Sequence, residues 1–167
     1  MPRTSARAIR GLTHLGPRGE ARMVDVSPKV ETTREALARA TLRMRPQTLR
    51  LVRAGNAPKG DVLGVARTAG ILAAKRTHEL IPLCHPLRIT GVDIAFADDL
   101  GRGELTVQAR VRTVDKTGVE MEALTAASVA ALTVYDMVKA VERGVTIARV
   151  QLMEKSGGRS GTWRRAR

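Results

Sequence analysis

Two runs of alternating apolar and polar residues constrain the fold of this chain more than any other feature. The run LRITGVDIAFA, residues 87–97, alternates with a slip in phase at Gly91, which indicates a strand with a β-bulge. The run GELTVQARVRT, residues 103–113, alternates without interruption. Because the polar stretch ADDLGRG joins them, the two runs predict an antiparallel hairpin.

Helices and further strands are predicted on both sides of this hairpin. Capping residues, prolines and helical periodicity predict a short helix and two long ones, over 47–55, from 61 up to Pro82, and over 120–143. Strands are predicted over 21–27, over 30–44, where a helix is the competing interpretation, and over 145–155.

This order of elements is strand, helix, strand, strand, helix, strand. It predicts an α+β fold with a ferredoxin-like antiparallel sheet, two long helices packed on one face and an extra short helix. The helix over 120–143 is apolar nearly all round in its middle. We therefore expect it to be covered on more than one side, with a second subunit as one candidate.

The 167 residues suffice for one compact domain, which we place at 12–162. We expect a flexible basic arm over 1–11 and a basic tail over 163–167. Seven arginines at 3–10 and 159–167, in end segments without acidic residues, carry about half of the net charge of +13. Aromatic residues make up only 2% of the chain, which argues against a surface for stacking nucleic-acid bases.

The lone cysteine and the lack of an early signal-peptide pattern predict a cytoplasmic protein without disulfides. The longest uncharged apolar run, 123–135, is shorter than the roughly 20 residues that cross a membrane. We expect no membrane span.

The stretch KRTHELIPLCHPL holds two of the three histidines and the cysteine. Zinc needs three or four converging ligands, and only His14 remains outside this stretch, so we expect no metal site. Cys84 and His85 also make a poor nucleophile and base, because neighbouring side chains of an extended chain point apart. Either His85 is structural, or it bonds a substrate from a connector stiffened by Pro82 and Pro86.

Two carboxylates, Glu120 and Glu122, follow Gly118. They share a face if the chain is extended there, and diverge by about 200° if it is helical. They either complement a helix N-terminus or accept hydrogen bonds from amino groups of a substrate.

Three lysines have alternative interpretations as well. Asp136 and Lys139 form an ordinary salt bridge or part of a site. Lys59 and Lys155 lie beside glycines, which suits either phosphate binding or a solvated loop. Residues 122 and 136 would lie about 21 Å apart on a continuous helix. A site that uses both therefore needs a long substrate or two chains.

Several motifs are more specific than the periodicity and capping signals described above. They are MVDVS, KGDV, AAKRT, ELIPLCHPL, KTGVEMEALTAASVAALTVYDM and KSGGRSG. In this order they resemble the molybdenum cofactor biosynthesis protein C family, the cyclic pyranopterin monophosphate synthases. The resemblance covers about 12–162.

The resemblance implies a lyase that converts (8S)-3',8-cyclo-7,8-dihydroguanosine 5'-triphosphate into cyclic pyranopterin monophosphate and diphosphate, without a redox cofactor. It implies a homohexamer, a trimer of dimers, with active sites at subunit interfaces. It also implies no membrane partner and no specific nucleic-acid partner. The ring opening, ring closure and cyclic phosphate formation are acid–base chemistry.

The resemblance also assigns site residues. Asp136 matches the active-site residue, and Lys59 and Lys139 match lysines required for the conversion. The substrate-binding segments match Leu83, Cys84, His85, Met121 and Glu122. Other positions in or near the pocket match Glu120, Lys155, Arg34 and Asp25.

We expect Lys59 and Lys155 to neutralise triphosphate charge and one of Lys59 or Lys139 to transfer protons. Lys139 is the weaker base because Asp136 would raise its pKa. The competing functional classes are a non-catalytic basic protein that binds nucleotide or nucleic acid, and a non-catalytic assembly partner.

Overall fold

The computed structural model describes residues 18–166. In chain order its elements are β1 (Thr32–Arg43), α1 (Pro46–Arg53), α2 (Val62–Lys75), α3 (Thr77–Leu80), β2 (Ile89–Asp99), β3 (Glu104–Asp115), α4 (Glu120–Val138), β4 (Thr146–Ser156) and β5 (Trp163–Arg164).

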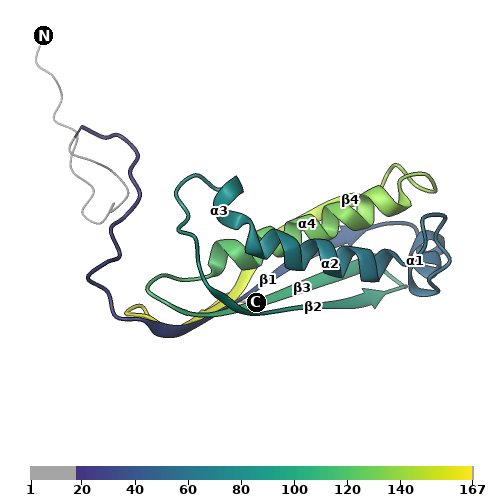
Figure 1. Ribbon diagram of the computed structural model, residues 1–167. Helices are drawn as coiled ribbons and strands as arrows, with labels where there is room; N and C mark the ends of the chain where they lie inside the picture. The colour runs from purple at the N-terminus through teal and green to yellow at the C-terminus, as the bar shows by residue number, and fades with distance from the viewer. Residues whose placement is uncertain (1–17, 167) are drawn as a thin grey trace, which may run out of the picture.

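The five strands form one antiparallel sheet in the order β2-β3-β1-β4-β5. Strand β3 lies between β1 and β2, which confirms the predicted ferredoxin-like arrangement. Helices α2 and α4 pack against each other over one face of this sheet (Figure 1). The predicted hairpin and bulge are also confirmed, because the β2-β3 register shifts between Ile89 and Gly91.

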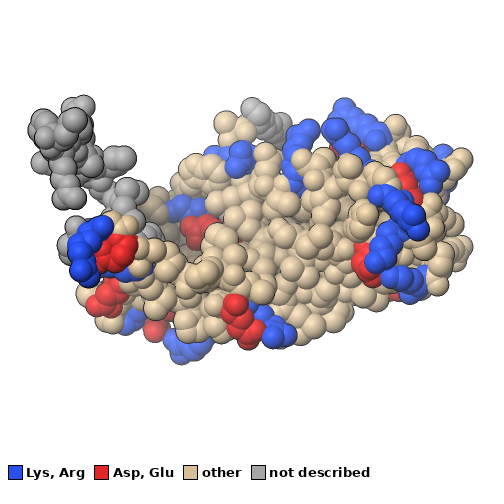
Figure 2. All heavy atoms as spheres, turned by 90° about the horizontal axis from the view of Figure 1, so that it is seen from above, with Lys and Arg blue, Asp and Glu red and all other residues tan. Residues whose placement is uncertain are grey.

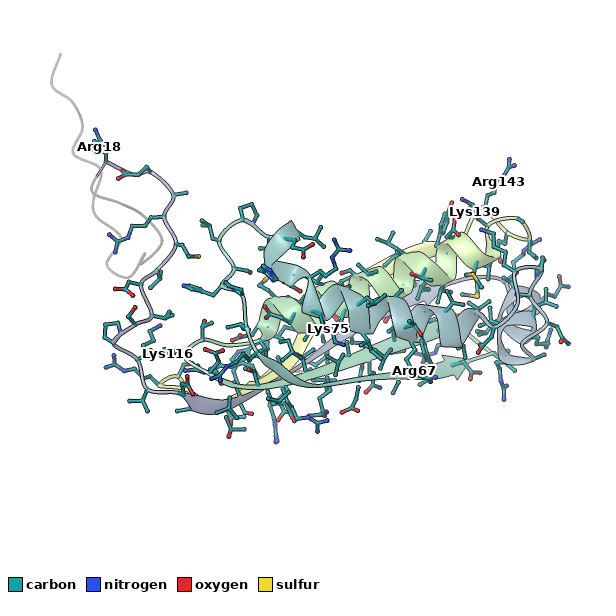
Figure 3. The ribbon with its side chains drawn as sticks, in the orientation of Figure 1. Arg18, Arg67, Lys75, Lys116, Lys139 and Arg143 are labelled. Atoms are coloured by element: carbon teal, nitrogen blue, oxygen red, sulfur yellow. The ribbon has the colours of Figure 1, made fainter. Side chains whose placement is uncertain are left out.

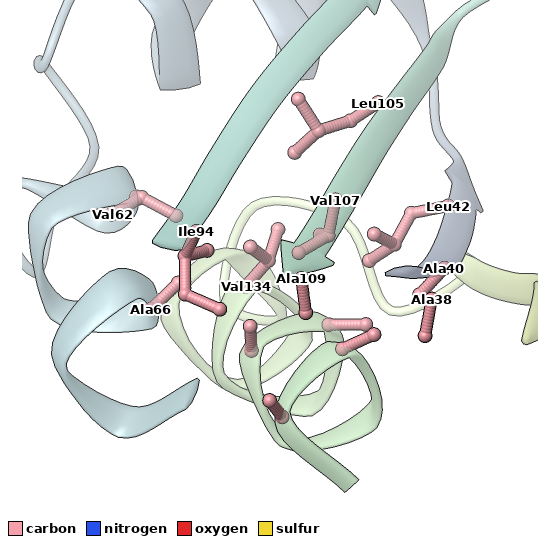
Figure 4. Close-up of a cluster of buried hydrophobic side chains, with 14 of the residues drawn as sticks. Ala38, Ala40, Leu42, Val62, Ala66, Ile94, Leu105, Val107, Ala109 and Val134 are labelled. Atoms are coloured by element: carbon pink, nitrogen blue, oxygen red, sulfur yellow. The ribbon is translucent and has the colours of Figure 1, made fainter. Parts of the chain in front are cut away.

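The core lies between the sheet and the two long helices (Figure 4). Alternate residues of β1, from Ala36 to Leu42, face the helices and are buried, which explains why this ambiguous segment is a strand. The core is filled mainly by alanine and valine, so the sheet and the helices approach each other closely.

The helix starts follow their sequence signals. Pro46 occupies the first turn of α1. The Asp61 carboxylate caps α2 by accepting a hydrogen bond from the Gly64 N–H at 2.9 Å. The helix signal that continues toward Pro82 breaks at Arg76 instead, where the Thr77 hydroxyl donates to the Ala73 carbonyl and the short α3 begins.

Helix α4 ends at Val138, five residues before the predicted end at Arg143. The chain there forms turns in which the N–H groups of Val141 and Glu142 both donate to the Val138 carbonyl. The Glu142 carboxylate accepts from the Arg45 N–H at 3.0 Å, and so ties this loop to the start of α1. Tertiary contact, which local sequence does not encode, ends the helix early.

Helix α4 is also long and apolar enough, by length and composition alone, to cross a membrane. Half of this apolar segment is buried inside the protein, and the helix contacts α2, β1, β3 and β4. These contacts account for its apolar composition as that of a core helix.

The predicted strand over 21–27 is wrong. Residues 22–26 have no strand structure, and the Asp25 carboxylate instead accepts from the Ser27 N–H at 2.8 Å to start a turn. At the other end, Trp163 and Arg164 of the predicted tail pair with β4 as β5. The predicted arm over 1–11 lies outside the described residues.

Candidate active site

A cavity of about 220 Å³ opens at the N-terminal end of α4. Three segments line it: the turn before β1, the connector between α3 and β2, and the first turn of α4. We call it the ring cavity. Its lining residues are Val24, Val26, Lys29, Leu83, Cys84, His85, Leu87, Thr117, Gly118, Glu120, Met121 and Glu122.

The connector holds His85 in a defined orientation. His85 Nε2 lies 2.8 Å from the Val24 carbonyl oxygen. Since a carbonyl can only accept, Nε2 carries the proton and Nδ1 remains an acceptor in the neutral ring. This bond also gives the Val24 carbonyl a partner outside any strand.

Cys84 and His85 both line this cavity. The chain turns at 81–83, just before them, where the Cys84 N–H donates to the Ile81 carbonyl. Burial, with a smaller effect of Glu122, raises the pKa of the Cys84 thiol. A thiol with a raised pKa is a poor nucleophile, which keeps Cys84 in a lining role.

The two glutamates of α4 differ in burial. The helix begins at Glu120, so the side chains diverge in the helical manner. Glu122 is only 4% exposed, whereas Met121 is 37% exposed. Burial, together with the charge of Glu120, raises the pKa of Glu122 to about 7. This carboxyl group can therefore both donate and accept a proton near neutral pH.

A second cluster lies at the C-terminal end of α4. Lys59 Nζ lies 2.8 Å from one Asp136 carboxylate oxygen, and Lys139 Nζ lies 2.7 Å from the other. Lys59 Nζ also donates to the Asp136 carbonyl at 3.0 Å. The loop that follows α1 carries Lys59 to this position, with Gly60 in a left-handed conformation. We call these three residues the lysine cluster.

Hydrogen bonds from Lys139 and then Lys59 lower the pKa of Asp136 to about 2. The same contact raises the pKa of Lys139. The salt bridge expected from their spacing is confirmed, as is the expected direction for Lys139. Lys139 is a poor base as long as it contacts Asp136. In this state its positive charge suits binding of a negatively charged group.

Two of the remaining predicted residues, Asp25 and Arg34, line a cavity that shares Lys29 with the ring cavity. Arg34 donates from Nε to the Asp115 carbonyl at 2.9 Å and from its terminal nitrogen to the Lys116 carbonyl at 3.0 Å. Lys155 donates to the Ser160 hydroxyl and to the Gly161 carbonyl at 2.9 Å, so the glycine-rich segment folds back over it. This loop is thus held in place and is not simply solvated.

The structure therefore separates the predicted site residues into two groups. Glu122 and Asp136 lie fourteen residues apart on one unbroken helix, which corresponds to about 21 Å. Figure 3 shows Lys116, beside the ring cavity, and Lys139 at opposite ends of the molecule. One small pocket of a single chain cannot contain both groups.

Within residues 18–166 no three histidine, cysteine or acidic side chains are grouped closely enough to hold a metal ion. His78 lies exposed on α3, away from the ring cavity. His14 lies outside the described residues.

Comparison with known proteins decides the family. The model of the MoaC family matches residues 23–158. This chain belongs to the MoaC family. It is similar to a protein of Thermomicrobium roseum named cyclic pyranopterin monophosphate synthase, at 66% identity over 92% of this chain and 93% of the relative. A protein of the same name from Pelotomaculum thermopropionicum is 59% identical over 94% of this chain and 92% of its own length.

In this MoaC family member the structure adds residues that sequence analysis missed. Lys29 and Thr117 line the ring cavity, and Lys116 Nζ donates to the Ser27 carbonyl at 3.0 Å, which joins two of the segments near it. Lys29 follows a turn that begins with an Asp-x-Ser pattern. That pattern predicts the turn, but only the fold shows which cavity the lysine faces.

Proposed function

We propose that this chain is a cyclic pyranopterin monophosphate synthase of molybdenum cofactor biosynthesis. It would convert (8S)-3',8-cyclo-7,8-dihydroguanosine 5'-triphosphate into cyclic pyranopterin monophosphate and diphosphate. The observation that carries this proposal is the 66% identity to a synthase over 92% of the chain. The two clusters of acid, base and cationic groups described above support it.

The ring cavity suits the purine-derived part of such a substrate. Glu120 and Glu122 can accept hydrogen bonds from ring amino groups, and His85 offers Nδ1 as a further acceptor. Met121 and Leu83 supply apolar contact beside them. Because Glu122 titrates near neutral pH, it can also deliver a proton during ring opening or closure.

The lysine cluster suits the phosphate chemistry. To form the cyclic phosphate, a hydroxyl oxygen loses its proton and attacks the α-phosphorus while the bond to diphosphate breaks. Lys59 and Lys139 can stabilise the charge that develops on the phosphate oxygens. In our proposal Asp136 holds both ammonium groups together until substrate arrives, and Lys155 and Arg34 add positive charge beside the ring cavity.

We further propose that two chains complete each site. An antiparallel pair of α4 helices across a two-fold axis would place the Glu122 end of one chain beside the Asp136 end of the other. The outer side of the helix layer suits such a contact, because Leu72 and Leu132 are 54% and 55% exposed there. Figure 2 shows the middle of this face without charged side chains. A hexamer built as a trimer of such dimers stays a proposal, as does a location in the cytoplasm.

The test replaces Lys59 and Lys139 singly by alanine in the full chain and measures pterin formation from the cyclic triphosphate. We expect each variant to lose at least about a hundredfold in kcat, the magnitude typical of a lost charge-stabilising group. Lys75→Ala, at the exposed end of α2, is the matched control and should turn over normally. Normal turnover by both Lys59→Ala and Lys139→Ala would disprove the assigned roles.

A further inference from the structure

Helix α1 has no capping side chain of its own. Its N-cap residue is Arg45, and a guanidinium cannot accept a hydrogen bond from the N–H groups of the first turn. The Glu142 carboxylate, in the loop after α4, takes this place. Its two oxygens lie 3.0 and 3.2 Å from the Arg45 nitrogen and accept from that N–H. A residue from a distant part of the chain thus caps α1, and its negative charge suits the N-terminal end of a helix.

Arg45 bonds back to the loop that holds Glu142. A terminal nitrogen of Arg45 donates to the Val141 carbonyl at 3.0 Å, and Arg45 Nε lies 3.5 Å from the Glu142 carboxylate. The Glu142 side chain is only 11% exposed, so competition from water at the carboxylate is limited. We call Arg45 and Glu142 the helix link, because they join the start of α1 to the end of α4 (Figure 1).

The helix link connects the two elements that carry the lysine cluster. Asp136 belongs to the last turn of α4, and Lys139 is the C-cap residue of that helix. Lys59 comes from the other element, because it lies in the loop that follows α1. The separation of the two ammonium groups therefore depends on how α1 lies against the end of α4.

The loop that carries Lys59 is fastened to α1. The Asn56 N–H donates to the Leu51 carbonyl at 3.1 Å, so a displacement of α1 would move the loop as well. Leu49 and Val52 bury one side of α1 in the core. Apolar contact of this kind is non-directional, whereas the hydrogen bonds of the helix link are directional and define the orientation of the short helix.

We propose that Glu142 is a positioning residue for the reaction: it orients α1 through the Arg45 N–H, and so places Lys59 opposite Lys139 at the Asp136 carboxylate. This inference rests on the proposed function and deepens it. Glu142 itself touches no reacting atom. It affects the rate because charge stabilisation needs the ammonium groups in place beforehand, and a displacement of about 1 Å can cost up to about a hundredfold.

A purely structural role for Glu142 predicts a different result. The loss of a helix cap lowers the stability of the protein, but leaves kcat of the folded molecules unchanged. A positioning role lowers kcat even where the variant is fully folded. It leaves KM nearly unchanged, because Lys59 and Lys139 act on charge that develops during the reaction.

The first experiment measures kcat and KM for the cyclic triphosphate well below the Tm of each variant. Glu142→Ala should lower kcat about tenfold and leave KM within about twofold. Glu142→Gln, which keeps an acceptor for the Arg45 N–H, should recover most of the loss. Glu104→Ala is the matched control and should keep the wild-type kcat. Glu104 pairs with Arg43 at 2.9 Å, close to the helix link, but joins β1 to β3.

The second experiment does not depend on turnover. The full chain is treated with limiting acetic anhydride, and mass spectrometry gives the acetylation rate at each lysine. In Glu142→Ala we expect Lys59 to react about two- to fivefold faster than in wild type, the equivalent of losing an exposed ion pair with Asp136. Lys139 should keep its wild-type rate, because its contact with Asp136 lies within one helix end. Glu104→Ala should change neither rate.

A wild-type kcat in folded Glu142→Ala would overturn the inference, as would a wild-type acetylation rate at Lys59 or equal acceleration at Lys59 and Lys139. If Glu142→Ala does not fold, Glu142→Asp replaces it. Its shorter side chain keeps the charge, and it should change both measurements in the same direction by a smaller amount. The proposed function fails separately, if the wild type forms no pterin from the cyclic triphosphate. The acetylation rates would still decide whether Glu142 places Lys59.

Discussion

At the scale of single residues, Glu122 is the group whose protonation depends most on the fold. In the unfolded chain its carboxyl group has an ordinary pKa of about 4.5, and burial raises this to about 7 in the folded protein. Between these values the folded state binds more protons than the unfolded state. The contribution of Glu122 to the free energy of unfolding therefore falls as the pH rises from about 4.5 to about 7, and is constant above that range.

The substitution Glu122→Gln tests this dependence. At pH 8 we expect the variant to be more stable than wild type by roughly 3 kcal/mol, because the wild type then contains a buried charge. Near pH 4 the two proteins should have almost equal free energies of unfolding. Urea unfolding at several pH values measures the difference, with Glu79→Gln on the exposed side of α3 as a control that keeps the wild-type profile. A constant difference across this pH range would contradict the assignment.

At the scale of elements, the contact between α2 and α4 depends on Gly70. A Cβ atom on this glycine would lie 3.1 Å from the Ala126 carbonyl oxygen and 3.3 Å from Ala130 Cβ. Glycine inside a helix is unfavourable by about 1 kcal/mol relative to alanine, so its presence here reflects the space available. The close approach holds both helices on the sheet and thereby fixes the positions of Glu122 and Asp136.

The substitution Gly70→Leu should separate the two helices. We expect a loss of about 1 to 3 kcal/mol in the free energy of unfolding, the usual magnitude for overpacking a core. Thermal unfolding measures it, and Lys75→Leu on the exposed end of the same helix serves as the control for added apolar volume. If Gly70→Leu were as stable as the control, the helices would have to pack less closely than the structure shows.

At the scale of the whole molecule, the two ends of α4 carry different halves of the proposed chemistry. The ring cavity lies at one end, and the lysine cluster lies at the other. An unbroken helix of 19 residues keeps them apart. A single chain is therefore incomplete as an enzyme unless the ligand spans that distance.

Mixed assemblies test whether two chains share each site. Lys59→Ala and Glu122→Ala, produced together in one cell, should recover about a quarter of wild-type activity, although each alone is inactive. Half of the dimers formed at random are mixed, and one of the two sites in each mixed dimer then contains neither substitution.

The control pair for this experiment is Lys59→Ala with Lys139→Ala. Both substitutions lie in the same half-site, so no combination of these chains contains an intact site. Recovery should then be absent. Equal activity from both mixtures would contradict a site shared across a two-fold axis.

The sequence by itself determined the sheet, the helix starts and the candidate site residues. Alternation defines β2 and β3 because one face of each strand is buried and the other is not. The cap at Asp61 and the proline at Pro46 act within a few residues, so they can be recognised locally. The site residues followed from motifs that this family shares.

Only the tertiary structure decided the remaining features, because each depends on residues far apart in the chain. Val24 lies outside any strand and bonds His85, and Glu142 ends α4 early by bonding Arg45. Lys29 lines the ring cavity, whose other walls come from the connector before β2 and from the first turn of α4. Periodicity and capping report local backbone preference, whereas these contacts depend on how the packed layers bring distant loops together.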